Sequence, residues 1–402
     1  MSSTKKKPFS MNLRDVENFF KYRRMPYPKR SAEFIALIAV SCTLFLFLHT
    51  KSLNSRLHEM EIKLQPSELS AIGLSASNAI QSGSDSKSDL KGVHGTYQYL
   101  KSTGQLHELN SFKLNNTRRA EMDTVFFNRV PKVGSETLIE LMKQLSDING
   151  FTLFREKQPK AILVTLGPIQ QLQLAEDIAD LEQPAAYVHH VNFINFTHLE
   201  VPRPIYINMV RDPVERVISW FYYARAPWVQ AQRQRNFPSV PGPKVQWLKK
   251  DFESCVRNGD KECNYIENSD LEHVSDHRRQ TLFFCGHSRK DCMPFNSERA
   301  LQIAKRTVES EYAVVGSWTD VNVTLTVLEH YIPKFFKGAH QIYHTESGGL
   351  ASNTNPLKPH VSEEIKARVR ANFSREIEFY EFCRQRLHKQ YLALRLDSNL
   401  NY

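Results

Sequence analysis

The stretch TVFFNRVPKVGSET, residues 124–137, decides the fold. Its first four residues, Thr124–Phe127, are β-branched or aromatic and predict a buried strand that ends at Asn128. Apolar residues at helical spacing over Thr137–Leu145 then predict a helix. The loop between strand and helix can therefore bind an anion, because backbone N–H groups at a helix N-terminus point outward with partial positive charge.

The loop Pro131–Thr137 offers several kinds of group to a phosphate. A lysine adds a point charge, a glycine lets the backbone approach closely, and two hydroxyls add donors. The groups expected to hold phosphate are those of Lys132, Val133, Gly134, Ser135 and Thr137. The spacing does not match the nucleotide-triphosphatase pattern G-x-x-x-x-G-K-[ST], and no acidic pair for Mg²⁺ follows. A plain helix start capped by Ser135 explains these residues equally well.

Strand-like and helix-like segments alternate beyond this unit. Further strands are expected at Ala161–Leu166, Tyr187–Val191, Ile205–Val210 and Tyr312–Val315, and helices at Ile169–Leu181, Val214–Tyr223, Val321–Tyr331 and Ser362–Leu387. This alternation predicts an α/β fold, with a mostly parallel sheet and helices on both faces. Residues 225–300 break the rhythm with a basic, proline- and cysteine-containing segment, which suits an insertion near the active site.

A second candidate phosphate site follows a later buried strand. Asp212 as N-cap, Pro213 at the first helical position and Glu215 completing a capping box account for the start of the next helix. Arg211 has no such structural explanation. It lies at the carboxyl end of a strand, where open α/β sheets bind ligands. With Ser219, two turns into the helix, it forms a second phosphate clamp.

The N-terminus predicts a membrane anchor. Residues 1–31 hold nine Lys or Arg and two acidic residues, so this segment carries +7 of the net charge of +10. The global charge is therefore no sign of a nucleic acid or other polyanionic partner. The apolar run within residues 32–51 approaches the ~20 residues of a spanning helix. The positive-inside rule then gives a cytoplasmic tail at 1–31, a lumenal stem at 52–120 and a catalytic domain at 121–402. A cleaved signal peptide is the alternative, although no small-x-small cleavage site follows.

The cysteines and sequons fit a lumenal domain. Cys255 and Cys263 are eight residues apart, and Cys285 and Cys292 are seven apart. In an oxidising compartment two close pairs predict two local disulfides, with four free buried thiols as the alternative. A metal site would need tighter Cys or His spacing. Cys383 is left over, as a buried thiol or an intermolecular partner. Glycosylation sequons occur at Asn115, Asn195, Asn322 and Asn372.

Taken together, these motifs resemble one family. RVPKVGSET and INMVRDPVERVIS look like the 5′- and 3′-phosphate-binding motifs of the sulfotransferase fold. VHHVNFINF, PIYINMVRDPVERVISWFYY, FFCGHSRKDC and the paired cysteines resemble, more narrowly, the uronyl and heparan sulfate 2-O-sulfotransferases. The similarity runs from about Val125 to Tyr380. It implies a P-loop-like sulfotransferase fold, PAPS as the sulfate donor, no metal, and a single-pass type II protein of the Golgi membrane.

The resemblance also implies roles for single residues. His190 lies in the register of the family's base, and a histidine pKa near ~6.5 suits it to take the proton of an acceptor hydroxyl. A satisfied structural His pair is the simpler interpretation of the same residues, and His189 is given no catalytic role. Lys132 would stabilise the leaving phosphate, while Arg211 and Ser219 would hold the 3′-phosphate.

The implied substrate is the 2-hydroxyl of a uronic acid or related sugar, in a glycosaminoglycan or a glycoprotein glycan. Arg129 and Arg225 are candidate substrate contacts, and Arg233 and Arg235 can extend a basic groove or simply form a solvated face. The basic L-R-K-T-like segment of relatives that act on heparan sulfate is replaced by GLASNT at 349–354, which puts that specificity in doubt.

Two further hypotheses come from other classes, and the chain's own oligomeric state stays open. An inactive glycan-binding relative would be expected to lack Lys132, His190 or Arg211, and all three are present. A glycosyltransferase would normally need a D-x-D-like metal site near a strand end, and the sequence has no convincing one. A homo-oligomer is compatible with the resemblance, but the chain ends soon after the expected terminal helix.

Overall fold

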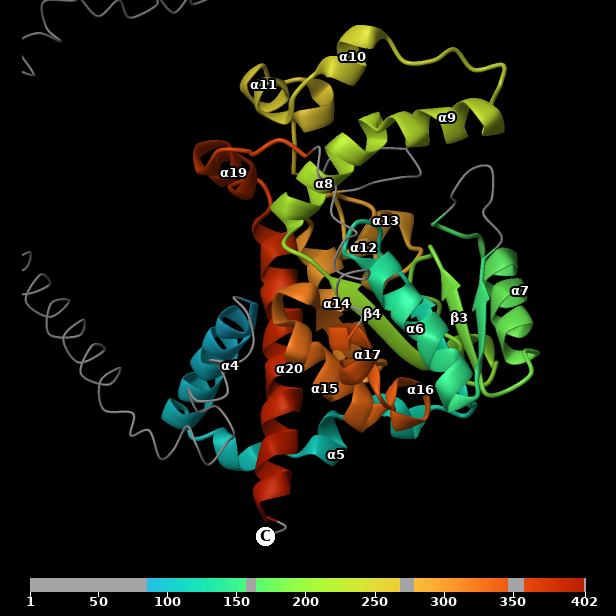
Figure 1. Cartoon of the computed structure of the whole chain (residues 1–402), viewed down its shortest axis with the longest axis vertical. Coiled ribbons are helices and arrows are strands. Elements are labelled where there is room, and N and C mark those ends of the chain that lie inside the picture. Colours follow the sequence, from blue (N-terminus) through green and yellow to red (C-terminus); the bar gives the residue numbers. More distant parts are fainter. Residues whose placement is uncertain (1–84, 157–163, 268–277, 346–357, 401–402) are drawn as a thin grey trace, which may run out of the picture. The chain divides into compact units, whose positions relative to one another are not determined.

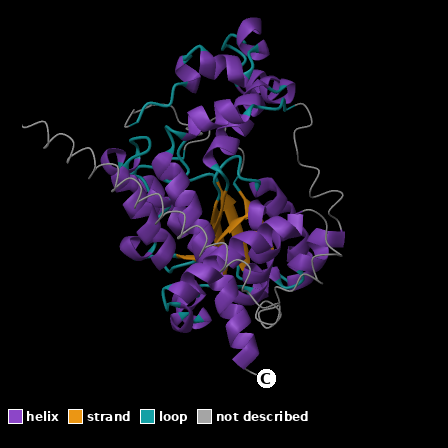
Figure 2. Ribbon diagram, turned by 90° about the vertical axis from the view of Figure 1, so that its left-hand side faces the viewer, coloured by secondary structure: helices purple, strands orange, loops and turns teal. Residues whose placement is uncertain are grey.

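The computed structural model describes residues 85–156, 164–267, 278–345 and 358–400. At its centre lies a five-stranded sheet of order β2–β3–β1–β4–β5, in which every neighbouring pair is parallel (Figure 1). The strands are β1 (Thr124–Asn128), β2 (Thr152–Arg155), β3 (Ala185–His189), β4 (Ile205–Val210) and β5 (Tyr312–Ser317). Helices surround the sheet, as Figure 2 shows from a second side. The predicted α/β fold with a central parallel sheet is confirmed.

The helices form the outer layers and the upper part of the molecule in Figure 1. They are α4 (Asp85–Ser102), α5 (Ser111–Leu114), α6 (Ser135–Asn149), α7 (Pro168–Ala179), α8 (Pro213–Arg225), α9 (Pro227–Asn236), α10 (Val245–Lys249), α11 (Phe252–Arg257), α12 (Leu282–Cys285), α13 (Arg289–Cys292), α14 (Glu298–Ser310), α15 (Val321–Tyr331), α16 (Pro333–Phe336), α17 (Ala339–Thr345), α19 (Glu363–Arg370) and α20 (Ser374–Leu400). Helices α14 and α15 each pack against α20, and all three pack on β5, while α6 packs on β2 and on α16.

Burial explains why the central strands were recognisable. Every residue of β1 and of β5 is buried, and β4 is buried from Tyr206 onward, as expected for parallel strands covered on both faces. The edge strand β2 is different, because its two end residues are exposed and its two central residues are only half-buried. Its sequence, TLFR, therefore lacks the continuous apolar run that predicts a buried strand, and it was missed.

Two expected elements need correction. The strand expected at Ala161–Leu166 lies partly outside the described residues, and residues 164–166 are not a strand. The single helix expected at Ser362–Leu387 is two helices, α19 and α20, and α20 continues to Leu400. The chain breaks between them because the side-chain oxygen of Asn296 accepts from the backbone amides of Arg375 (2.7 Å) and Glu376 (3.3 Å), which caps the first turn of α20.

The described part of the expected stem is helical and packed. Val93 and Leu100 of α4 are almost fully buried, and α4 lies along α20. The packed unit therefore includes α4 from Val93 onward. The expected tail and anchor, at 1–31 and 32–51, lie outside the described residues. Among the residues that are described, no helix is both long and apolar enough to cross a membrane.

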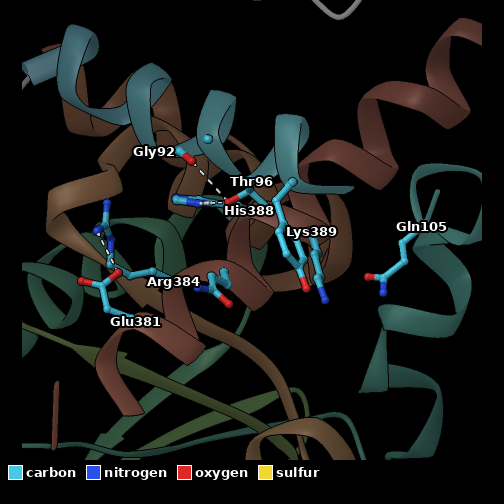
Figure 3. Close-up of a pocket in the computed structure, with 10 residues that line it drawn as sticks. Gly92, Thr96, Gln105, Glu381, Arg384, His388 and Lys389 are labelled. Carbon is cyan, nitrogen blue, oxygen red and sulfur yellow. Dashed lines mark hydrogen bonds and ion pairs between the residues drawn. The ribbon is translucent and has the colours of Figure 1, made fainter. Parts of the chain in front are cut away.

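A polar network anchors α4 and α20 to the end of β5. The carboxylate of Asp320, fully buried, takes two bonds from the guanidinium of Arg384 (2.7 and 2.9 Å) and one from His388 (3.1 Å). The other ring nitrogen of His388 lies 3.0 Å from the hydroxyl of Thr96 on α4. Thr96, Arg384 and His388 also line a cavity of about 740 Å³ between the two helices (Figure 3).

The insertion at 225–300 forms a second core on the outer face of α8. Buried residues of α8 pack there with Phe252, Tyr265, Phe295 and with Phe373, which precedes α20. Both predicted disulfides are present, Cys255–Cys263 inside this core and Cys285–Cys292 beside α12. Cys383 is a buried free thiol.

Candidate functional site

The loop between β1 and α6 needs its glycine for two reasons. Gly134 has φ of +85°, in the left-handed region that only glycine adopts without strain. A Cβ there would lie 2.3 Å from Cδ1 of Trp318, whose indole N–H donates to the carbonyl of Gly134 at 2.9 Å. Lys132 also has a left-handed φ of +66°. Such reversals turn neighbouring backbone amides towards one side, which is the arrangement that binds anions.

Two arginines hold the carbonyls of this loop. Nε of Arg216, a fully buried side chain of α8, donates to the carbonyl of Pro131 at 2.9 Å. Nη1 of Arg211 donates to the carbonyl of Lys132 at 3.3 Å. The two predicted phosphate motifs are thus in direct contact. Since the carbonyls of Pro131 and Lys132 are already engaged, we expect an anion to bind at the amides of the loop and the start of α6.

Lys132 lies near two other positive charges, those of Arg211 and Lys358. Its ammonium nitrogen sits 4.0 Å from the centre of the Tyr223 ring. Burial, then repulsion from Arg211, lowers the pKa of Lys132 to about 8 even though Glu136 acts in the opposite direction. A lysine whose charge is this costly is matched to an anionic ligand, which would restore the favourable pairing.

Arg211 is positioned through a relay that sequence reasoning missed. The side chain of Gln280 donates to the carbonyl of Arg211 at 3.0 Å and accepts from its amide at 3.4 Å. Glu376, buried in α20, in turn accepts from the backbone amide of Gln280 at 2.8 Å. The sequence held no signal for this relay, because the three residues are far apart along the chain.

The start of α8 is built differently from the expected capping box. The carboxylate of Asp212 accepts from the amides of Val214 and Glu215, at 2.9 and 3.0 Å, so the N-cap is confirmed. The Glu215 carboxylate instead pairs with Lys358 at 2.9 Å and Lys366 at 3.0 Å. It also lies 3.9 Å from Arg211, so it moderates the charge of that arginine. The capping-box role of Glu215 was therefore wrong.

Ser219 lies four residues after Glu215 on α8. Residues four apart share a helix face, so half-buried Ser219 lies on the same side of α8 as the carboxylate nearest Arg211. Ser135 is buried and Thr137 half-buried, and both lie in the first turn of α6. The residues expected to hold two phosphates therefore come from the loop and first turn of α6, and from the end of β4 and the middle of α8.

The ring of His190 has one defined proton position. His190 follows the last residue of β3, and its Nδ1 lies 3.0 Å from the backbone carbonyl of Arg129. A carbonyl can only accept, so Nδ1 carries the proton and Nε2 has its lone pair available. Within the described residues Nε2 has no partner. Burial and then the charge of Arg129 lower the pKa of His190 to about 3, so the ring is neutral.

The neighbouring His189 has a different environment. Its Nε2 lies 3.3 Å from the carboxylate of Glu156, and burial lowers its pKa to about 4. Glu156 also accepts from the backbone amide of His190 at 3.4 Å. His189 and Glu156 therefore position the segment that carries His190.

The structure separates the two arginines expected to contact substrate. Arg129, only 7 % exposed, pairs with Glu136 at 2.6 Å, and its carbonyl orients His190, so it joins the loop to the base. Arg225 is also buried, with different partners. It donates to Glu262 at 2.7 Å, and its guanidinium carbon lies 3.4 Å from the ring centre of Phe221. These contacts give Arg225 a structural role, and its contact with substrate stays a prediction.

Asn128 is the other residue that sequence reasoning passed over. It ends β1, and its side chain accepts from the hydroxyl of Tyr312 at 2.7 Å and donates to the carbonyl of Phe283 at 3.0 Å. Asn208 of β4 donates to its backbone carbonyl at 2.7 Å. The network fixes the strand ends from which the loop and the His190 segment depart. A polar residue at the end of a buried apolar run was the available signal.

The four sequons differ in exposure. Asn195 and Asn372 are exposed, while Asn115 and Asn322 are half-buried. The side-chain oxygen of Asn322 is 2.9 Å from a ring nitrogen of His344, and Thr324 of the same sequon is fully buried. The exposed pair is therefore better placed to accept a glycan.

Comparison with known proteins defines the class. The chain belongs to the sulfotransferase family, whose model matches residues 115–383, and it is a sulfotransferase enzyme. It is 43 % identical to uronyl 2-sulfotransferase homolog pip of Drosophila melanogaster, over 98 % of this chain and 95 % of that protein. It is 29 % identical to uronyl 2-sulfotransferase of Mus musculus, over 69 % of this chain and 65 % of that protein. It is 28 % identical to heparan sulfate 2-O-sulfotransferase 1 of Homo sapiens, over 76 % of this chain and 82 % of that protein.

Proposed function

We propose that this sulfotransferase moves sulfate from PAPS to the 2-hydroxyl of a uronic acid or related sugar, in a glycosaminoglycan or a glycoprotein glycan. One observation carries the proposal. The cationic loop around Lys132 and the neutral base His190 are joined by Arg129. This residue lies two positions before the loop, and its backbone carbonyl accepts a hydrogen bond from Nδ1 of His190.

The donor set fits PAPS, which carries a phosphosulfate and a separate 3′-phosphate. Two distinct cationic positions are present, Lys132 at the loop and Arg211 at the end of β4, linked by the 3.3 Å bond between them. Lys132, Ser135, Thr137 and the amides of Val133 and Gly134 would hold the 5′ end, and Arg211 with Ser219 would hold the 3′-phosphate. When bound, PAPS supplies the sulfuryl group and leaves as PAP.

The residues of the chain supply the proton transfer and the charge stabilisation. Nε2 of His190 accepts the proton of the acceptor hydroxyl as its oxygen bonds to sulfur. Nδ1 keeps its own proton on the carbonyl of Arg129, which fixes the ring as the imidazole becomes charged. Lys132 places its positive charge against the 5′-phosphate, where negative charge grows as the sulfur–oxygen bond breaks. No step in this account requires a metal ion.

The cellular location of the enzyme is part of the proposal. We propose a single-pass type II protein of the Golgi membrane, with the domain in the lumen. Two disulfides within one domain support an oxidising compartment. The relatives' printed names support a glycan acceptor.

The test is transfer of labelled sulfate from PAPS to a panel of uronic-acid polymers and glycoproteins. Wild type should label at least one acceptor. Lys132→Ala should bind PAP at least about tenfold more weakly, and His190→Ala should keep PAP binding without transfer. Transfer by the His190 variant at the wild-type rate would remove the base assignment. Failure of wild type to bind PAP would contradict the assignment of PAPS as the sulfate donor.

A further inference from the structure

The charge of Lys132 is not balanced by a carboxylate. Within the described residues, no acidic side chain pairs directly with its ammonium group. Glu136 acts on Lys132 from a distance, and its carboxylate already pairs with Arg129 at 2.6 Å. The charges of Arg211 and Lys358 act in the opposite direction and favour loss of the proton. Another group must therefore help to keep this lysine charged.

An aromatic ring lies against the ammonium group instead. Nζ of Lys132 is 4.0 Å from the centre of the Tyr223 ring. The negative face of an aromatic ring attracts a cation at this distance, and the attraction is stronger where water is excluded. Burial, and then the charge of Glu136, raise the pKa of Tyr223, so its hydroxyl stays neutral while Lys132 titrates. The ring thus favours the ammonium form without adding a charge of its own.

Helix α8 places this ring beside the loop. Arg216, Ser219 and Tyr223 are spaced three and then four residues apart, so they share one face of the helix. Nε of Arg216 donates to the carbonyl of Pro131 at 2.9 Å, directly before Lys132. The face of α8 that fixes the backbone of the loop therefore also presents a ring to the side chain of its lysine.

We propose that Tyr223 is a positioning residue for Lys132, and that its ring holds the ammonium group charged and beside the loop before the donor binds. The inference rests on the proposed function, because it takes Lys132 as the ligand of the donor's 5′-phosphate. It adds a residue that acts through Lys132 and sets the upper pH limit of donor binding.

The first arm of the test follows PAP affinity against pH by calorimetry. In wild type the affinity should fall as pH rises past about 8, where Lys132 loses its charge. Tyr223→Leu removes the ring and should move this fall about 0.4–1.5 pH units lower, because the charged lysine loses a cation–π contact. Tyr223→Phe keeps an aromatic face and should follow wild type. In the Lys132→Ala background, Tyr223→Leu should cause no further change in the pH dependence.

Tyr222→Leu is the matched control. Tyr222 is the adjacent residue of α8, but its hydroxyl accepts from the backbone amide of Phe252 at 3.2 Å and its ring packs against the core of the insertion. This variant should lose stability and keep the pH dependence of wild type. Tyr223 is 36 % exposed, so Tyr223→Leu should fold. An equal shift of the pH dependence in the two leucine variants would overturn the inference.

The second arm measures the pKa of Lys132 directly and needs no PAP. The NMR signal of its ε-carbon, assigned by its absence from Lys132→Ala, is followed against pH in the free protein. Tyr223→Leu should lower this pKa by the amount seen in the first arm. An unchanged pKa would overturn the inference while PAP binding and transfer stand. Failure of wild type to bind PAP, with the shift of the pKa still present, would instead overturn the proposed function.

Discussion

Nδ1 of His190 donates to the backbone carbonyl of Arg129 across 3.0 Å, two residues before the proline that begins the phosphate-binding loop. The contact is to backbone, so it depends on where β1 ends rather than on the arginine side chain. It fixes the tautomer that leaves Nε2 basic. The position of the proposed base is thereby coupled to the strand that positions the proposed phosphate loop.

Replacing His190 by Asn should remove the base and keep this contact, because the Asn amide can still donate to the carbonyl of Arg129. We expect kcat to fall by about 10²–10⁴ with PAP affinity unchanged. His189→Gln is the control, since its amide can retain the contact with Glu156 and its kcat should stay within about threefold. Equal losses in the two variants, measured by steady-state transfer, would show that the histidine pair acts structurally.

The pH dependence of kcat/KM should reflect the ionisation of both His190 and Lys132. Transfer needs neutral His190, whose pKa is lowered to about 3, and charged Lys132, whose pKa is lowered to about 8. For the free enzyme kcat/KM should therefore be flat through the ordinary histidine range, and it should fall as pH rises past about 8. Lys132→Arg keeps its charge at high pH, so its alkaline fall should disappear. An acid limb near ~6.5 that His190→Asn abolishes would contradict the burial of this ring.

Gly134→Ala should disable the loop. The new Cβ would meet Trp318 at 2.3 Å in addition to the cost of a left-handed residue, about 1–2 kcal/mol. PAP affinity should fall by more than about tenfold if the loop moves by enough to lose one anion contact. Gly104→Ala is matched for its φ of +72° but has open space around it, so it should keep PAP affinity. Calorimetry on both variants separates the clash from the backbone cost.

Asp320→Asn should loosen the docking of α4 and α20. It leaves Arg384 and His388 without their carboxylate, and breaking a buried pair costs about 3–5 kcal/mol of unfolding free energy. Glu364→Gln, which breaks an exposed pair with Arg257, should cost less than about 1 kcal/mol. Urea unfolding measures both, and equal values for the two variants would show that the buried network is not stabilising.

The same network predicts the sign of an acid effect. Burial raises the pKa of Asp320, but the hydrogen bonds from Arg384 and His388 outweigh it, so the net shift is downward. The stabilisation is therefore complete above the unfolded value, about 3.9, and is lost as pH falls through the lower folded value. The Asp320→Asn variant should lack this part of the acid dependence.

The sequence predicted what is local and periodic. The β4 run from Ile205 to Val210 and the α15 run from Val321 to Tyr331 match the structure at both ends, because continuous burial and helical spacing are written in adjacent residues. Strand β2 escaped because an edge strand that is half-exposed shows no apolar run. The break before α20 escaped because its cap, Asn296, lies 79 residues away from Arg375.

In the candidate site too, the local features could be predicted and the tertiary contacts could not. Lys132 and Gly134 were recognisable from their place between a strand and a helix. The pairing of Arg225 with Glu262 could not be predicted, because a charge in sequence does not reveal its partner in space. The relay from Glu376 through Gln280 to Arg211 depends on tertiary contacts alone.

The central claim is that the loop at Lys132 and the clamp at Arg211 form one PAP site. Titration of PAP by calorimetry into wild type, Lys132→Ala, Arg211→Ala and Lys366→Ala tests it directly. Lys366 is the control, because it pairs with Glu215 beside the site but makes no contact with the loop. We predict at least about tenfold weaker binding for the first two variants, from the loss of a charge-assisted contact in each, and wild-type affinity for the third. Wild-type affinity in both Lys132→Ala and Arg211→Ala would contradict the account.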